Sequence, residues 1–160
     1  MKGKEISRRG FLSIALAAGG AIAIGETMFV GLRFLAPKAT DGAFGGEFNL
    51  GPYDQFPLAS VTPVEAGRFY LVRLQDGGFL AVYRRCTHLG CSVPYDPSIQ
   101  QFVCPCHGSE FTMEGDVLTA PAPRPLDIFP LSITETGEVV IDTSNPIERG
   151  QTDPSQIVYA

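Results

Sequence analysis

The N-terminal part of the chain is dominated by one long apolar run. Residues 11–35 are predominantly apolar, and about 20 such residues span the roughly 30 Å hydrocarbon core of a bilayer. The apolar core of a secretory signal is usually shorter, so we predict an uncleaved transmembrane anchor over residues 11–36. Glu26 is the one acidic residue in the run. Because a carboxylate at mid-depth is costly, we expect it near the outer interface or against a partner helix.

The residues at the start of this run predict its orientation. Residues 1–10 are polar and basic, and Ser7-Arg8-Arg9-Gly10-Phe11-Leu12 resembles a twin-arginine export signal. Basic residues on the short N-terminal side keep that end in the cytoplasm. We therefore expect the following domain on the outer, periplasmic or extracytoplasmic, side of a bacterial cytoplasmic membrane. The alternative is a cleaved signal with its cut within residues 36–39, where Pro37 is unfavourable.

Beyond residue 46 the apolar residues form short runs separated by turn residues, which is a β pattern. The strongest signal is Asp76-Gly77 between two apolar runs, which predicts a hairpin. A second hairpin is predicted about residues 135–137. Strands are predicted over residues 69–74, 79–83, 101–103, 111–113, 126–133 and 138–141. The expected fold is mainly β: a transmembrane helix followed by an all-antiparallel domain, residues 47–143, that includes a subdomain around the candidate site described below.

Two segments flank this domain. Residues 37–46 contain three glycines, Gly42, Gly45 and Gly46, and predict a flexible neck. Residues 144–160 form a polar C-terminal tail, and the sequence leaves open whether it is disordered or straps onto a partner.

Composition supports a loop-rich β domain, because the chain has 18 Gly and 13 Pro. Charge is uneven along the chain. After residue 40 there are six basic and fifteen acidic residues, a net charge of −9. This acidity argues against nucleic acid as a partner and is compatible with a basic protein surface.

The candidate chemistry lies in two short runs, Cys86–Cys91 and Cys104–Ser109, which hold all four cysteines and both histidines of the chain. The simplest division is a Cys-x-His followed by a Cys-x-x-His, which offers two thiolates and two imidazoles. Such a set fits zinc, or a [2Fe–2S] centre in which two histidines replace two cysteines on one iron. One cysteine in each run is left over, and a tetrahedral zinc site has no use for these two. A domain held only by disulfides, with two idle histidines, is a further alternative.

Cys-Thr-His-Leu-Gly-Cys followed by Cys-Pro-Cys-His-Gly-Ser resembles the paired cluster boxes of Rieske iron–sulfur proteins from cytochrome bc1 and b6f complexes. The match combines ligands, spacing, extra cysteines and glycines. It implies one [2Fe–2S] Rieske cluster with two cysteines on one iron, two histidines on the other, and a disulfide between the remaining cysteines: Cys86 and Cys104, His88 and His107, Cys91 and Cys106.

The resemblance also implies a function. Such a chain is the electron-transfer subunit of a membrane quinol–cytochrome c (or plastocyanin-like) oxidoreductase, and no turnover is expected from the chain alone. His88 and His107 face the quinol, from which one electron and one proton are taken, and the electron passes to a c-type haem. The implied partners are a b-type cytochrome subunit with the quinol site and a c-type cytochrome. Leu89 and the loop at Pro121 would form an apolar docking rim.

Neighbouring residues adjust this expectation. By resemblance, the Ser109 hydroxyl bonds a bridging sulfide. At position 111 bc1-type proteins usually carry a Tyr that bonds a ligand thiolate, whereas this chain has Phe111. Losing that hydrogen bond disfavours the reduced cluster, so we expect a lower potential that suits menaquinol better than ubiquinol.

Two other redox classes share parts of the pattern. The small Rieske subunit of an exported molybdenum oxidase of the arsenite oxidase type also combines an export signal with these boxes, but it tends to carry a bulkier residue where this chain has Gly108. Rieske ferredoxins of cytosolic oxygenases lack the extra cysteines and the export signal.

Overall fold

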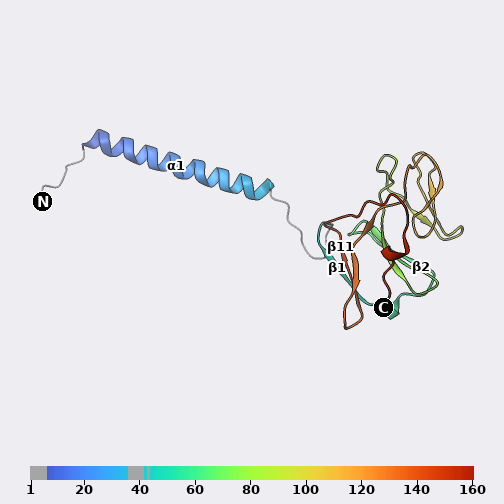
Figure 1. Cartoon of the computed structure of the whole chain (residues 1–160). Helices are drawn as coiled ribbons and strands as arrows, with labels where there is room; N and C mark the ends of the chain where they lie inside the picture. Colours follow the sequence, from blue (N-terminus) through green and yellow to red (C-terminus); the bar gives the residue numbers. More distant parts are fainter. Residues whose placement is uncertain (1–6, 36–41, 43) are drawn as a thin grey trace. The chain divides into compact units, whose positions relative to one another are not determined.

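The computed structural model describes residues 7–35, 42 and 44–160. The chain divides into two units, an N-terminal helical unit and a β domain, which are described separately (Figure 1). Residues 1–6 of the predicted export signal, and most of the predicted neck, lie outside the described residues.

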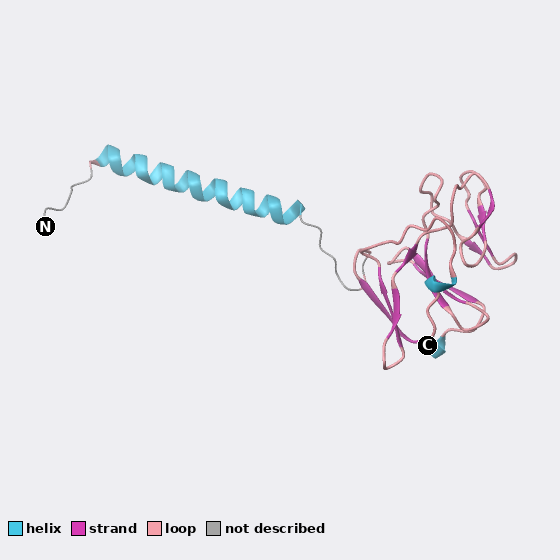
Figure 2. Cartoon of the chain, viewed as in Figure 1, coloured by secondary structure: helices cyan, strands magenta, loops and turns pink. Residues whose placement is uncertain are grey.

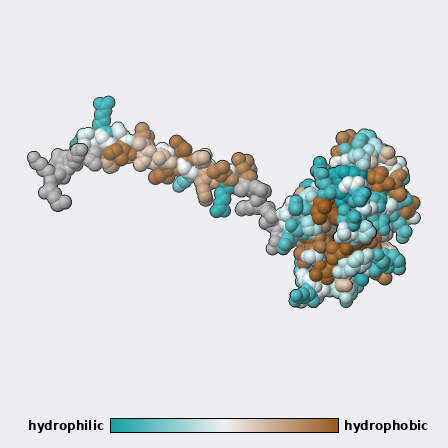
Figure 3. All heavy atoms as spheres, viewed as in Figure 1, coloured by the Kyte–Doolittle hydropathy of each residue, from teal (hydrophilic) through white to brown (hydrophobic). Residues whose placement is uncertain are grey.

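The predicted apolar helix is present as α1, Arg8–Leu35, with 28 residues. At about 1.5 Å per residue it is roughly 42 Å long. Ser7 caps its start, because the Gly10 N–H donates to the Ser7 hydroxyl at 3.2 Å. By length and composition α1 is able to cross a membrane. Figure 3 shows apolar side chains along most of its length.

The hydroxyl groups of α1 are satisfied within the helix itself. Ser13 and Thr27 donate to the carbonyl oxygens of Arg9 and Ala23, four residues earlier, at 3.0 and 2.8 Å. Such internal hydrogen bonds let these side chains lie in an apolar medium at low cost.

The β domain contains three antiparallel sheets (Figure 2). Their strand orders are β1-β11-β10, β2-β3-β4-β9 and β5-β6-β7-β8. The strands are β1 (Glu47–Pro52), β2 (Ser60–Val64), β3 (Phe69–Arg73), β4 (Phe79–Tyr83), β5 (Tyr95–Asp96), β6 (Gln101–Val103), β7 (Glu110–Phe111), β8 (Val117–Thr119), β9 (Ile128–Phe129), β10 (Leu131–Ile133) and β11 (Glu138–Asp142), with two 3₁₀ turns, η1 (Tyr53–Gln55) and η2 (Pro154–Gln156). The expected antiparallel β fold after an apolar helix is confirmed.

The central pair of strands, β3 and β4, is buried on both faces. The first four residues of each strand are buried, and their register pairs Phe69 with Tyr83 and Arg73 with Phe79. One face packs into a core shared with β1 and β11, and the other into a core shared with the candidate site. Double burial explains why these strands are continuous apolar runs and lack alternation.

The prediction of one strand over residues 126–133 is wrong in one respect. The structure has two strands there, β9 and β10, separated by Pro130. Before Pro130, β9 pairs with β4; after it, β10 pairs with β11. Proline has no N–H to continue a ladder, and its carbonyl accepts from the Asp142 N–H at 3.0 Å. The chain therefore passes from one sheet to another at this residue.

The strand predicted over residues 111–113 is shorter than expected and ends at Phe111. The Thr112 N–H donates to the Asp116 carbonyl at 2.8 Å, and the Gly115 N–H returns to Thr112 at 2.9 Å. Gly115 has φ of +90°, a conformation that favours glycine. The turn therefore begins at Thr112, and the strand ends one residue before it.

The described end of the predicted neck belongs to the β domain. The Gly45 N–H donates to the Thr143 hydroxyl at 2.9 Å, and this hydroxyl donates to the Gly46 carbonyl at 2.8 Å. The ring of Phe44 packs against aromatic rings of the domain. Any flexible connection therefore ends before Phe44.

The C-terminal tail is ordered and packs on its own domain, which answers a question that the sequence left open. Val158 and Phe79 exchange backbone hydrogen bonds of 2.8 and 3.1 Å. The Tyr159 hydroxyl donates to the Asp76 carboxylate at 2.8 Å. Residues 144–160 thus form a strap across the end of the β3–β4 hairpin.

The strap also carries a buried cation, Arg149, which is 2% exposed. Its guanidinium donates to the carbonyl oxygens of Leu126 and Glu114 at 2.7 and 2.8 Å. Burial lowers the pKa of Arg149 to about 10, opposed by the nearby carboxylates of Asp116 and Asp127. Arg149 stays charged at neutral pH and ties the strap to two loops.

We predict that Arg149→Met destabilises the domain by about 3 kcal/mol, because two buried carbonyl groups lose their donors. Urea unfolding of the full chain in detergent, followed by circular dichroism, measures this. Arg85→Met is the matched control: Arg85 is exposed, so its replacement should change stability by less than about 0.5 kcal/mol. Equal stability of the two variants would contradict the structural role of Arg149.

Candidate metal centre

The first candidate ligand loop, residues 86–91, is closed by two backbone hydrogen bonds. The Cys86 N–H donates to the Cys91 carbonyl at 2.8 Å, and the Gly90 N–H donates to the Cys86 carbonyl at 2.9 Å. Gly90 has φ of +81°, in the left-handed region that suits glycine. Only Arg84 and Arg85 separate the loop from the end of β4, so the loop begins close to the doubly buried sheet.

The second loop, residues 104–109, repeats this pattern. The Cys104 N–H donates to the Ser109 carbonyl at 2.8 Å, and the Gly108 N–H donates to the Cys104 carbonyl at 3.0 Å. Gly108 has φ of +75°, in the left-handed region that favours glycine. The backbone conformation therefore explains why a glycine follows His107. The loop connects β6 to β7. The two loops are thus equivalent turns, each with a cysteine at its first position.

A disulfide between Cys91 and Cys106 joins the two loops, as the resemblance implied. The Sγ atoms of these residues and of Cys104 lie within 4.8 Å of one another. Two of these three sulfurs are committed to the disulfide. The free thiols are therefore Cys86 and Cys104, which are both buried.

The two free thiols are neighbours in the core. The groups around Cys86 both oppose and favour its ionisation. Burial raises the pKa of Cys86, while the backbone N–H groups of His88 and Leu89 donate to its sulfur and oppose this effect. Amides aimed at sulfur stabilise a thiolate. A buried thiolate needs a bound cation to remain charged, and iron of a cluster fits this requirement.

The two histidines of these loops are more exposed to solvent than the two free thiols. Their ring centroids are 4.9 Å apart, with the rings nearly perpendicular at 85°. His107 is exposed and His88 half-buried. The donor set is therefore polarised, with buried sulfur on one side and accessible nitrogen on the other, and it fits a [2Fe–2S] group with one sulfur-bound and one nitrogen-bound iron.

A third loop, residues 120–124, is held against both ligand loops. The Ala122 N–H donates to the hydroxyl of fully buried Ser109 at 3.0 Å. The Thr87 hydroxyl donates to the Arg124 carbonyl at 2.7 Å. Sequence analysis missed Thr87, because a hydroxyl between a cysteine and a histidine has no ligand spacing of its own.

The remaining predicted residues lie around these loops. Phe111 is fully buried in the core that contains both free thiols. Leu89 is 70% exposed, and Pro121 is exposed. Their role as an apolar docking rim stays a prediction.

Comparison with known proteins decides the family. A family model described as the Rieske [2Fe-2S] domain matches residues 50–130. The chain belongs to the Rieske [2Fe–2S] family. Its cofactor is accordingly a [2Fe–2S] Rieske cluster, which favours the cluster over the zinc and disulfide-only alternatives. The assignment of individual ligands remains a prediction.

Relatives of the Rieske chain are similar over most of their length. It is 33% identical to the cytochrome b6-f complex iron-sulfur subunit of Chlorobaculum tepidum, covering 88% of this chain and 78% of that one. It is 32% identical to subunit 3 of the same name from Nostoc, covering 85% of each. A chain in the structure titled "Hyperthermophilic respiratory Complex III" matches with a TM-score of 0.51 and 28% identity over 79% of this chain and 98% of that one.

We predict that replacing both disulfide cysteines, as in Cys91→Ala/Cys106→Ala, lowers stability by about 3 kcal/mol, because the bridge closes a loop of about 15 residues in the unfolded chain. The Rieske cluster should also be lost faster, since the loops that enclose it are no longer linked. Thermal unfolding and the decay of cluster absorbance measure the two effects. Unchanged stability and cluster lifetime would contradict this role.

Proposed function

We propose that the chain is the Rieske iron–sulfur subunit of a membrane quinol–cytochrome c (or plastocyanin-like) oxidoreductase. In this role it takes one electron and one proton from quinol and passes the electron to a c-type haem. The single observation that carries the proposal is that two adjacent, solvent-accessible imidazoles belong to the same two loops as two buried free thiols. Similarity to b6-f iron-sulfur subunits over most of both chains supports it, and favours this class over a molybdenum oxidase subunit.

We assign Cys86 and Cys104 to one iron, and His88 and His107 to the other. When bound, the cluster supplies one-electron redox chemistry, and imidazole ligation places its potential above that of an all-cysteine cluster. The thiols are placed by the core and by the hydrogen bonds of their loops. The imidazoles are placed at the surface, where a substrate can reach them.

The histidines have a second role in the proposal. A ring nitrogen that points to solvent can accept a hydrogen bond from a quinol hydroxyl and hold its proton. Leu89 and Pro121 exclude water beside these rings and offer an apolar rim to a b-type cytochrome subunit that carries the quinol site. A basic surface on the c-type cytochrome would complement the acidic domain.

The proposed membrane arrangement is based on α1 and on the basic residues at and before its N-terminal end. We propose a single-pass anchor with its N-terminus in the cytoplasm, after export by the twin-arginine route, and the Rieske domain on the outer side. A folded, cluster-loaded domain is the cargo that this route accepts. The neck before Phe44 then allows the domain to reach its two partners in turn.

We predict that an EPR-monitored redox titration of the purified full chain gives a Rieske-type signal whose potential falls as pH rises. Where one proton accompanies the electron, the slope is about 59 mV per pH unit. A potential independent of pH would contradict proton transfer by the histidines. A colourless protein that contains zinc would contradict the cluster itself.

We predict that Phe111→Tyr raises the potential. A hydroxyl near the thiolates adds a hydrogen bond that favours the reduced cluster by about 1 kcal/mol, which is about 40 mV for one electron. The same titration measures the shift, with Phe111→Leu as an apolar control that should not raise the potential. A potential unchanged by Tyr would remove the support for menaquinol as the donor.

A further inference from the structure

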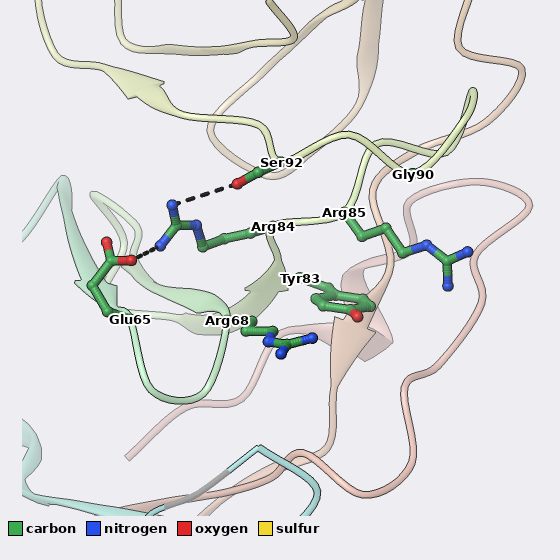
Figure 4. Close-up of a pocket in the computed structure, with 7 residues that line it drawn as sticks. All are labelled: Glu65, Arg68, Tyr83, Arg84, Arg85, Gly90 and Ser92. Carbon is green, nitrogen blue, oxygen red and sulfur yellow. Dashed lines mark hydrogen bonds and ion pairs between the residues drawn. The ribbon is translucent and has the colours of Figure 1, made fainter. Parts of the chain in front are cut away.

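A groove of about 520 Å³ lies beside the first ligand loop (Figure 4). It is lined by Arg68, Tyr83, Arg84, Arg85, Gly90 and Ser92, with Glu65 at one end. Three arginines in one groove are unexpected in a domain whose net charge is −9. None of them takes part in the proposed cluster chemistry.

These three arginines are half of the six basic residues after residue 40. Each of the other three is engaged within the domain. Arg73 donates to backbone carbonyls, Arg124 pairs with Asp127, and Arg149 is buried. Accessible positive charge in the described β domain is therefore concentrated in the groove.

Within the groove, the arginines differ in whether a carboxylate of the described residues neutralises them. Arg84 forms an ion pair with Glu65 and lies 3.5 Å from the Ser92 hydroxyl. Among the described residues, Arg68 and Arg85 form no ion pair. In the view of Figure 4, their guanidinium groups lie on either side of the Tyr83 ring. Because no carboxylate of the described residues neutralises either guanidinium, both remain able to bind a phosphate through paired hydrogen bonds.

The position of the groove along the chain suggests the source of that phosphate. The Arg68 guanidinium lies 4.6 Å from the ring centre of Phe44, whose ring stacks on Tyr83 at 5.9 Å. Phe44 is nine residues after Leu35, where α1 ends. A chain of that length spans at most about 30 Å. Because the chain between Leu35 and Phe44 is short, the groove stays close to the membrane that holds α1. Its local concentration there is high, so a weak affinity is enough for it to be occupied by lipid.

We propose that the groove of Arg68 and Arg85 binds the phosphate of an anionic phospholipid head group in the membrane that holds α1. The proposal rests on the membrane anchorage proposed above. A tyrosine such as Tyr83 suits the head-group region. The acidic remainder of the domain is repelled by an anionic surface, so the attraction is confined to the groove.

The cluster-loaded full chain in lipid nanodiscs tests this proposal by hydrogen–deuterium exchange. Discs of phosphatidylcholine alone are compared with discs containing 20% phosphatidylglycerol. We expect slower exchange in peptides covering residues 65–70 and 83–92 in the anionic discs only. Each arginine near an anionic surface contributes about fivefold to binding, so Arg68→Gln/Arg85→Gln should weaken it roughly 30-fold and abolish the protection.

Two further variants distinguish binding by the groove from an effect of the net charge of the domain. Arg124→Gln removes a positive charge elsewhere and should keep the protection. Glu65→Gln frees Arg84 and should increase it. Protection in the double variant equal to that of the unchanged chain would overturn the proposal. Equal protection by inorganic phosphate in neutral discs would also overturn it, by assigning the groove to free anions.

Other outcomes also decide the matter. Absence of lipid-dependent protection, together with slower reduction of the double variant in the assembled complex, would overturn the lipid proposal and assign the groove to an acidic protein surface. The Rieske EPR signal is recorded on the same discs and reports the cluster independently. A chain that does not remain with the discs would overturn the anchorage, and the groove proposal with it.

Discussion

The structure depends most on the burial of the two free thiols, Cys86 and Cys104, in the same apolar core as the central sheet. This core is continuous with one face of β3 and β4, and the opposite face of these strands is covered by the sheet of β1, β11 and β10. Side chains packed at crystal-like density leave little freedom for the loops that they support. In the proposed assignment, Cys86 and Cys104 would hold a cluster from within this core, and His88 and His107 would hold it from nearer the surface.

Three connections then hold the ligand loops in place. The disulfide joins the two loops to each other, and the hydrogen bonds of Thr87 and Ser109 join each of them to the loop at Pro121. The same connections hold the loop of Pro121, which we propose as part of a docking rim, against the ligand loops. The contacts that stabilise the site would therefore also position the proposed docking surface.

The features that the sequence predicts are those set by residues close together in the chain. The hairpin about Asp76-Gly77, the apolar helix and the paired cysteine–histidine boxes each carry their signal within a few residues. The division at Pro130 depends on which sheet each half joins, and the burial of Arg149 depends on carbonyls of two distant loops. Thr87 and the arginine groove likewise acquire meaning only through contacts with residues far along the chain. These features are set by tertiary packing and have no signature in the local pattern.

The central claim, that both histidines bind one cluster, is tested most directly by ENDOR spectroscopy of the reduced full chain labelled with ¹⁵N-histidine. The chain contains two histidines, so the origin of any labelled coupling is restricted to His88 and His107. The account predicts two strong nitrogen couplings, and loss of one on replacing either histidine. A single coupling, or none, would contradict it.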